Sequence, residues 1–311
     1  MDEGALLVFG GVTHRLLLDA SSLMYRAFFS IPATVTAPDG RPVNAVHGYL
    51  DMVANLIASR QPDECVHVYD DDWRPAPRVA IYSGYKAARR PDPEGLPPQF
   101  EMLREVLAAL GQPQAEAPGW EAEDAIGTLC ARAARADRAD IVTGDRDLIQ
   151  LVRDPAVRVL FTVRGVSDLR VLDEPGVLER FGVPASRYVD FAILRGDPSD
   201  GLPGVQGVGE KTARALVNEY PSIDALVADA NAPRRTGRSL QRSPGLCGRI
   251  RDGAEYLAAM REVVPIRTNL EIRRWKGDRD DRLADELAER YRLTGPVGRL
   301  RRALDGDRSR A

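Results

Sequence analysis

The sequence predicts an α/β protein in which helices flank a parallel β-sheet. Three short and continuous apolar runs, at residues 16–19, 64–70 and 140–145, are typical of buried parallel strands. Longer segments with helical periodicity separate these runs, and this alternation indicates a parallel sheet with right-handed crossovers. The chain has 311 residues, which is enough for one large domain and a smaller second one.

The expected helices are justified by periodicity and by their end signals. Residues 44–59 place Val46, Tyr49, Val53 and Leu56 on one helical face. Residues 96–111 begin with prolines and end with glycine, as helices prefer. Further helical patterns cover the ranges 120–136, 255–264, 283–293 and 295–304, and residues 213–230 indicate two helices separated at Pro221. Residues 231–252 lie between the helical patterns at 213–230 and 255–264. They are basic and rich in proline, glycine and serine, so we expect a mobile loop there.

Composition excludes several classes of protein. Hydrophobic residues make up 44% and charged residues 29% of the chain, which is ordinary for a globular protein, and no run of eighteen apolar residues is present to span a membrane. The acidic start is too short in apolar residues for a secretory signal, so residues 1–13 are expected to be a disordered leader. Three scattered cysteines fit a reducing cytosol, and three histidines without ligand spacing argue against zinc.

Each of the three predicted strands finishes in an aspartate, namely Asp19, Asp70 and Asp145. Ligand sites of open α/β sheets lie beyond the carboxyl ends of the strands, so these side chains are expected to share one site. Other acids fall near them along the chain: Glu121, Glu123, Asp124, Asp147, Asp197 and Asp200. The three acids at 121–124 also fit a simpler interpretation, because acidic residues stabilise the N-terminus of a helix.

Such a cluster indicates divalent metal ions. Carboxylates within a few ångströms of one another cannot all stay ionised without cations, and oxygen ligands select Mg²⁺ or Mn²⁺. Two ions about 4 Å apart suit phosphodiester hydrolysis, in which they activate water and stabilise charge on the phosphate. The net charge of −3 does not exclude a nucleic-acid partner, because without the nine candidate ligands the remaining 37 acids are fewer than the 43 basic residues.

Six segments together carry a family resemblance. LLLDASSLMYRAF, VYDDDWRPAPR, GYKAARRPDP, GWEAEDAI, VTGDRDLIQL and GDPSDGLPGVQGVGEKTA occur in the order found in bacterial and phage 5′ nucleases of the flap-endonuclease superfamily. The chain resembles that family from about Arg15 to Ile272, and the family includes the N-terminal 5′-3′ exonuclease domain of bacterial DNA polymerase I. The resemblance implies a PIN-like nuclease domain at 14–187 with a helical arch at about 76–111. A helix-three-turn-helix DNA-binding domain is implied at 188–272, with 273–311 as an extension that packs on the nuclease domain.

The resemblance also implies roles for individual residues. Two or three Mg²⁺ or Mn²⁺ ions would be bound by Asp19, Asp70, Glu121, Glu123, Asp124, Asp145, Asp147, Asp197 and Asp200. Lys86 and Arg89 correspond to basic residues near the scissile phosphate, where a fixed cation stabilises the transition state. Together with Asp145 and Asp147 they form the implied catalytic set. Arg26 matches a phosphate-contacting arginine, and Tyr85 a residue that positions DNA. Residue type alone leaves a simpler alternative for each: a solvated basic turn for Lys86 and Arg89, a surface salt bridge for Arg26, and a packed ring for Tyr85.

The glycine-rich stretch GVQGVGEKTA resembles the hairpin of the family's helix-three-turn-helix element. In the family its backbone carbonyls bind K⁺, which bridges to duplex phosphate. Here Gly204, Gly207 and Gly209 permit close phosphate approach, and Lys211 and Thr212 begin the next helix. Such contacts position DNA without reading its sequence, although a glycine-rich turn can also be purely structural.

Three positions depart from the family pattern. Glu123 stands where aspartate is usual, and its extra methylene is expected to shift the geometry of the second ion. Ala20 replaces a glycine after the first aspartate, and Gly201 replaces an asparagine, with the expected loss of one polar contact.

The function implied is that of a divalent-metal-dependent phosphodiesterase, a 5′ exonuclease or flap endonuclease acting on flaps, gaps or ends of DNA in replication and repair. We expect a monomer in the cytoplasm, at the nucleoid, with no membrane contact and with a polymerase and a ligase as partners. Two alternatives stay open: a structure-specific DNA-binding protein with little activity, and a PIN-type ribonuclease. A phosphatase with a strand-end aspartate is disfavoured, because Ala20 and Ser21 follow Asp19 without a second acid.

Overall fold

The computed structural model describes residues 14–133, 137–163, 166, 168–232 and 240–308. The leader expected at 1–13 lies outside these residues. In the part of the chain that is described, no helix has both the length and the apolar character needed to cross a membrane.

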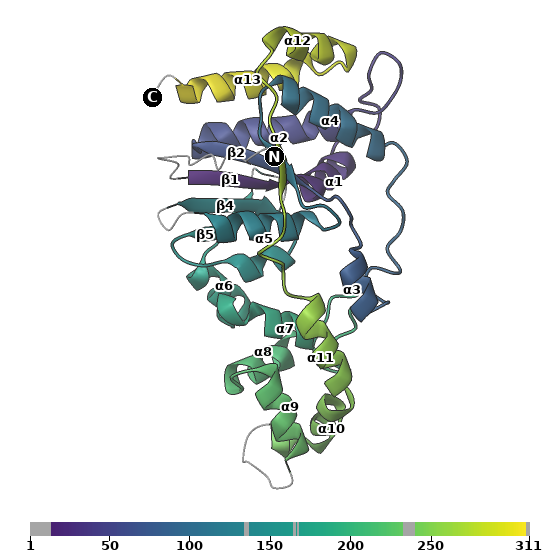
Figure 1. Cartoon of the computed structure of the whole chain (residues 1–311), viewed down its shortest axis with the longest axis vertical. Coiled ribbons are helices and arrows are strands. Elements are labelled where there is room, and N and C mark those ends of the chain that lie inside the picture. The colour runs from purple at the N-terminus through teal and green to yellow at the C-terminus, as the bar shows by residue number, and fades with distance from the viewer. Residues whose placement is uncertain (1–13, 134–136, 164–165, 167, 233–239, 309–311) are drawn as a thin grey trace, which may run out of the picture.

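A seven-stranded sheet forms the centre of the larger part of the molecule (Figure 1). Its strand order is β6-β5-β4-β1-β2-β3-β7, and the strands are β1 (His14–Asp19), β2 (Glu64–Tyr69), β3 (Gln114–Glu116), β4 (Arg138–Thr143), β5 (Val157–Thr162), β6 (Leu169–Leu172) and β7 (Arg273–Trp275). The five inner strands pair in parallel, whereas β6 and β7 run antiparallel at the two edges. The predicted α/β fold is confirmed. The edge strands escaped prediction because they are half exposed and carry no continuous apolar run.

Helices cover both faces of this sheet because its central strand is apolar on both sides. Leu16 and Leu18 of β1 pack with one set of helices and Leu17 with the other. The first face carries α1 (Ala20–Ser30), α2 (Asn44–Arg60), α4 (Pro97–Ala109), α12 (Asp281–Arg290) and α13 (Thr294–Arg308). The second face carries α5 (Ala122–Arg132) and α6 (Glu174–Phe181). Residues 16–18 of β1 are thereby buried on both faces of the sheet, and the strand finishes at Asp19.

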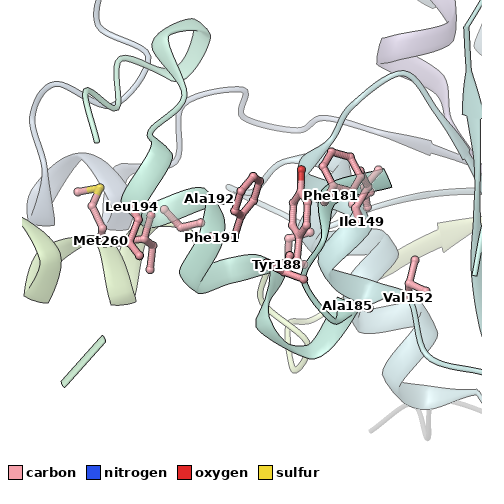
Figure 2. Packing of buried hydrophobic residues seen from close by; sticks show 14 of the residues in the cluster. Ile149, Val152, Phe181, Ala185, Tyr188, Phe191, Ala192, Leu194 and Met260 are labelled. Atoms are coloured by element: carbon pink, nitrogen blue, oxygen red, sulfur yellow. The ribbon is translucent and has the colours of Figure 1, made fainter. Parts of the chain in front are cut away.

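The smaller part of the molecule is helical and continues the second face of the sheet. It contains α7 (Tyr188–Arg195), α8 (Glu210–Glu219), α9 (Ile223–Asn231), α10 (Pro244–Asp252) and α11 (Ala254–Val263). Figure 2 shows α7 between the two parts: Tyr188 packs near Phe181, and Leu194 lies beside Met260 of α11. The rings of Phe181 and Tyr188 meet edge to face, with centroids 5.2 Å apart. The two parts therefore share one continuous apolar core, which fixes α7–α11 relative to the sheet.

The loop expected at residues 231–252 is only partly a loop. Within that range, residues 240–242 form a short 3-10 helix and residues 244–252 form α10, whose Cys247 and Ile250 are buried. Residues 233–239 lie outside the described part of the chain. The basic, glycine- and proline-rich composition misled the prediction, because Pro244 occupies the first position of the helix, where proline is well tolerated.

The region expected as an arch, residues 76–111, has helices at its two ends. They are α3 (Ala76–Ile81) and α4, and the intervening residues 82–96 form turns. Figure 1 shows α3 beside α11 of the helical part, away from α4. Lys86 and Arg89 are carried by the turns close to the C-terminal end of α3.

The C-terminal segment, residues 273–308, packs on the part of the molecule that contains the sheet. Strand β7 pairs with β3, and the guanidinium of Arg299 on α13 donates to Asp51 on α2 over 2.7 Å. Tyr291, at the end of α12, donates to Glu105 of α4 over 2.7 Å. These contacts cover the outer surface of α2 and α4.

Candidate active site

The sheet brings three strand ends to one place. Asp19 ends β1, Asp70 directly follows β2, and Asp145 lies two residues beyond β4. Because β1 pairs with both β2 and β4, the carboxyl ends of these strands are adjacent. A cavity of about 290 Å³ opens there, and all three aspartates line it.

Hydrogen bonds fix the orientation of these carboxylates. Asp19 caps α1 by accepting from the Ser22 backbone N–H over 3.0 Å, and it accepts from the Thr143 hydroxyl over 2.6 Å. Asp70 accepts from the backbone N–H of Ala122, the first residue of α5, over 2.7 Å. These bonds tie the ends of β1, β2 and β4 to the start of two helices.

Six of the nine predicted acids line this one cavity. They are Asp19, Asp70, Glu121, Glu123, Asp145 and Asp197, together with the basic residues Lys86, Arg89 and Arg146. Acids thus outnumber bases on the lining, and in the described part of the chain neither a histidine nor a cysteine contributes to it. This set of donors fits hard divalent cations such as Mg²⁺ or Mn²⁺.

The other three predicted acids occupy different positions around the cavity. Asp147 begins the 3-10 helix η1 (Asp147–Leu151), and its backbone N–H donates to Asp145 over 2.9 Å. Asp200 ends the 3-10 helix η3 (Pro198–Asp200) and lies 3.7 Å from the ammonium of Lys86. Asp124 is fully buried and is not part of the lining. Its two oxygens accept from the Arg78 guanidinium over 2.8 Å each, although an oxygen of Asp124 also lies within 4.8 Å of oxygens of Glu121 and Glu123.

Burial and mutual repulsion disfavour ionisation of the clustered acids. Burial raises the pKa of Asp19 to about 7, and the charges of Asp70 and Asp145 act in the same direction. Burial likewise raises the pKa of Glu123 well above its ordinary value, with repulsion from Glu121 adding to it. The pKa of Asp147 is raised by burial and by Asp145. A divalent cation would relieve this repulsion.

Lys86 lies inside the acidic cluster. Its side chain is 5% exposed, and its ammonium contacts a carboxylate oxygen of Glu121 and lies 5.2 Å from the ring centre of Tyr85. Burial alone would lower the pKa of Lys86, but the carboxylates of Glu121 and Asp200 outweigh it and raise that pKa. Lys86 therefore stays charged. Its backbone is in the left-handed region, with φ of 49°.

Gly201 explains how the turn carrying Lys86 docks beside Asp200. The backbone N–H of Lys86 donates to the Asp200 carbonyl over 2.9 Å, and Gly201 has a φ of +71°. A Cβ at Gly201 would lie 2.3 Å from the carbonyl oxygen of Gly84. An asparagine side chain, which the family pattern has at this position, would collide with the Gly84 carbonyl. The close contact between the two backbones therefore explains why glycine stands at 201.

Arg89 lines the cavity, whereas Arg26 does not. The Arg89 guanidinium sits 5.8 Å from the ring centre of Tyr25 and 5.4 Å from that of Trp73, so two aromatic rings orient it. Arg26 donates to the backbone carbonyls of Thr162 and Val163 over 3.0 and 3.2 Å.

Tyr85 is placed differently from the expectation. It is 3% exposed, and its hydroxyl donates to Glu121 over 2.5 Å. The hydroxyl of Tyr85 therefore holds Glu121, one of the acids that line the cavity.

The hairpin residues lie outside the cavity lining. Gly204 and Gly207 both have positive φ, and a Cβ on Gly204 would lie 2.5 Å from the Arg195 backbone, so this glycine is required by packing. Gly209 caps α8 and has open space around it. Lys211 is exposed and Thr212 half-buried on the first turn of α8. Gly207 and Gly209 are exposed whereas Val208 between them is buried, so these two glycines are the part of the hairpin that a phosphate can approach.

Sequence reasoning missed Arg78, which contacts three predicted ligands. Its segment, WRPAPR, gives no periodic signal, and arginine is ordinarily exposed. Ser22 was also missed. Its hydroxyl accepts from the Gly144 N–H over 2.9 Å, which ties α1 to the turn before Asp145. Such a role is visible only when the two segments are seen together.

Comparison with known proteins gives matches along nearly the whole chain. Residues 14–182 match the family described as 5′-3′ exonuclease, N-terminal resolvase-like domain, and residues 183–280 match 5′-3′ exonuclease, C-terminal SAM fold. A protein of Mycobacterium tuberculosis named 5′-3′ exonuclease is 40% identical over 315 residues, which cover 93% of this chain and 97% of that protein. DNA polymerase I of Mycobacterium bovis is 39% identical over 277 residues, which cover 88% of this chain and 30% of the polymerase.

A solved structure shares the fold. The flap endonuclease of bacteriophage T5, in a pseudo-enzyme–product complex with DNA and metal ions, matches with a TM-score of 0.63 at 16% identity. The match covers 95% of this chain and 99% of the phage chain.

Proposed function

The chain belongs to the 5′-3′ exonuclease family, and from that premise we propose that it hydrolyses phosphodiester bonds at 5′ flaps, gaps and 5′ ends of DNA with the help of divalent metal ions. The observation that carries the proposal is the convergence of six carboxylates from distant segments in one cavity that also contains Lys86 and Arg89.

Two or three Mg²⁺ or Mn²⁺ ions are proposed as the cofactors. The lining acids Asp19, Asp70, Glu121, Glu123, Asp145 and Asp197 would bind them, with Asp147 and Asp200 adjoining. When bound, such ions supply an activated water and stabilise negative charge on the phosphate. Asp124 is proposed to act by holding its neighbours, because Arg78 and the Arg267 backbone N–H occupy its oxygens.

Lys86 and Arg89 are proposed to stabilise the charge that develops on the scissile phosphate. Both line the cavity, and both stand on the turn that follows α3. In this structure the Lys86 ammonium is engaged by Glu121 and Asp200. A metal ion that enters the cavity would compete with the ammonium for these carboxylates, and a phosphate would compete with the carboxylates for the ammonium, so that the ammonium would face the substrate.

DNA is proposed to bind through phosphate contacts. Gly207, Gly209, Lys211 and Thr212 offer exposed backbone and a cation at the start of α8, and a K⁺ ion at the hairpin carbonyls would bridge to duplex phosphate. Arg26, at the other side of the cavity, would contact the strand that is cut. Binding of this kind does not depend on base sequence.

The alternatives are less well supported. The relatives named as exonucleases do not favour a DNA-binding protein with little activity. A PIN-type ribonuclease would not need the hairpin at 204–212. We further propose that the protein acts as a monomer at the nucleoid and works beside a replication or repair polymerase and a ligase.

A labelled duplex with a 5′ flap, incubated with the protein and Mn²⁺, tests the function. We expect short 5′ fragments, no cleavage in EDTA, and slower cleavage of a matched RNA flap. Tight DNA binding without cleavage in Mn²⁺ would refute the enzymatic proposal, and preferential cleavage of the RNA flap would favour the ribonuclease.

A further inference from the structure

Arg78 is a buried cation at the junction of three segments. It belongs to α3, and its side chain is 1% exposed. Burying a guanidinium is costly unless its donors are satisfied and its charge is paired. The surroundings of Arg78 meet both conditions, which marks it as more than a surface residue that happens to be covered.

The Arg78 guanidinium donates to two places: to the acidic turn, which is the start of α5 with Glu121, Glu123 and Asp124, and to the end of α11. One terminal nitrogen lies 2.5 Å from Glu121 and 3.1 Å from Glu123, and the two terminal nitrogens bind the two oxygens of Asp124 over 2.8 Å each. The Nε–H donates to the carbonyl of Val263 over 3.0 Å. Figure 1 shows α3 next to α11, on the side of the molecule where the helical part begins.

Neighbouring rings and loops keep the guanidinium in place. It lies 5.6 Å from the ring centre of Tyr85 and 5.8 Å from that of Trp120. Asp124 is held from its other side by the backbone N–H of Arg267, over 2.8 Å. Because Val263 ends α11 and Arg267 follows that helix, Arg78 and Asp124 connect the first turn of α5 to the helical part of the chain.

The three acids at the start of α5, Glu121, Glu123 and Asp124, differ in whether they line the cavity. Arg78 contacts all three of Glu121, Glu123 and Asp124, yet only Glu121 and Glu123 line the cavity. Without a fixed cation behind them, three carboxylates on one helical turn would repel one another and spread apart. The guanidinium therefore sets the directions of Glu121 and Glu123.

We propose that Arg78 is a positioning residue for the nuclease reaction. Held in place by Asp124, it orients the carboxylates of Glu121 and Glu123 toward the divalent metal ions. It also links this orientation to the position of α11. The inference rests on the proposed function, because it assumes that these two acids bind the metal ions. Asp124 is then a structural partner of Arg78 and binds no ion.

The test compares Mn²⁺ binding in variants of the full chain, measured by electron paramagnetic resonance without DNA. Arg78→Lys retains a charge but lacks the planar fork, and Arg78→Met removes the charge. Both should weaken Mn²⁺ binding about 10- to 100-fold, the range seen when groups behind metal ligands are removed. Asp124→Asn should retain the wild-type number of bound ions. Turnover of a 5′-flap substrate should fall with Arg78→Lys while KM for DNA stays within about twofold.

Arg104→Lys is the matched control. Arg104 also pairs with a buried acid, Glu116, and stacks 4.0 Å from the ring centre of Tyr69, but it is not among the residues that line the cavity. It should lower the melting temperature without changing Mn²⁺ affinity. If Arg78→Lys behaves like this control, Arg78 is merely structural and the inference is overturned.

Two further outcomes have defined meanings. Loss of one bound ion in Asp124→Asn would make Asp124 a ligand and also overturn the inference. If Arg78→Met does not fold, Arg78→Lys and Asp124→Asn still decide it. Absence of Mn²⁺ binding by the wild-type protein would instead contradict the proposed function itself.

Discussion

Asp19 makes the metal-free protein sensitive to pH in a direction that can be calculated. Its carboxyl group is 6% exposed, and burial raises its pKa from 3.8 to about 7. Between these values the folded protein retains a proton that the unfolded chain has released. The stabilising contribution of this proton is complete below pH 3.8 and is lost as the pH rises through 7.

The magnitude follows from the size of the shift. One proton retained on folding changes the free energy of unfolding by about 1.4 kcal/mol per pH unit. From pH 5 to pH 7 the metal-free protein should therefore lose about 2 kcal/mol of stability through Asp19, which for a chain of this length corresponds to a drop in melting temperature of about 3 °C. Glu123 and Asp147, whose pKa values are also raised by burial, act in the same direction.

The assay is thermal unfolding followed by circular dichroism in EDTA at several pH values. Asp19→Asn is the control, because the amide does not titrate; the variant should retain only the part of the pH dependence that Glu123 and Asp147 contribute. Saturating Mg²⁺ should reverse it, since ions bind the ionised acids and stabilise the folded state as the pH rises. A metal-free protein whose melting temperature stays constant or rises from pH 5 to pH 7 would refute the reasoning.

The remaining predictions concern catalysis, DNA binding and packing. Asp145→Ala or Asp147→Ala should abolish cleavage of a 5′-flap substrate while DNA binding, measured by fluorescence anisotropy, stays largely intact; normal turnover would rule out their role. Lys86→Ala should lower kcat about 100- to 1,000-fold without weakening Mn²⁺ binding, because its ammonium competes with cations for Glu121. DNA affinity should fall steeply with salt, and Lys211→Ala should reduce the logarithmic slope by about one; an unchanged slope would contradict the hairpin role. Gly201→Ala should lower stability by about 1–3 kcal/mol in denaturant unfolding because its Cβ meets the Gly84 carbonyl, whereas Gly248→Ala, with open space around it, should not.

Much of the fold could be predicted because the pattern of burial is local. The inner strands β1, β2 and β4 are covered on both faces, so each appears in the sequence as a short apolar run. Helix α2, with one face in the core, shows helical periodicity at nearly its observed bounds. The strands β3, β5, β6 and β7 and the helix α10 were missed. Strand β3 has only three residues, β6 and β7 are half exposed, and the helix has a composition that is typical of loops, whereas β5 is a buried apolar run that the prediction overlooked.

Residue type and local periodicity establish the chemistry that is available: which residues are acids, that three of them end buried strands, and that glycines precede α8. Only the tertiary structure decided how those groups face one another. Arg78 reaches Asp124 across 46 residues and Val263 across 185, and these contacts turn Asp124 away from the cavity while Glu121 and Glu123 line it. The physical reason is that residue type and periodicity are properties of neighbouring positions, whereas the direction of a buried carboxylate is set by the cations and donors that the fold brings against it.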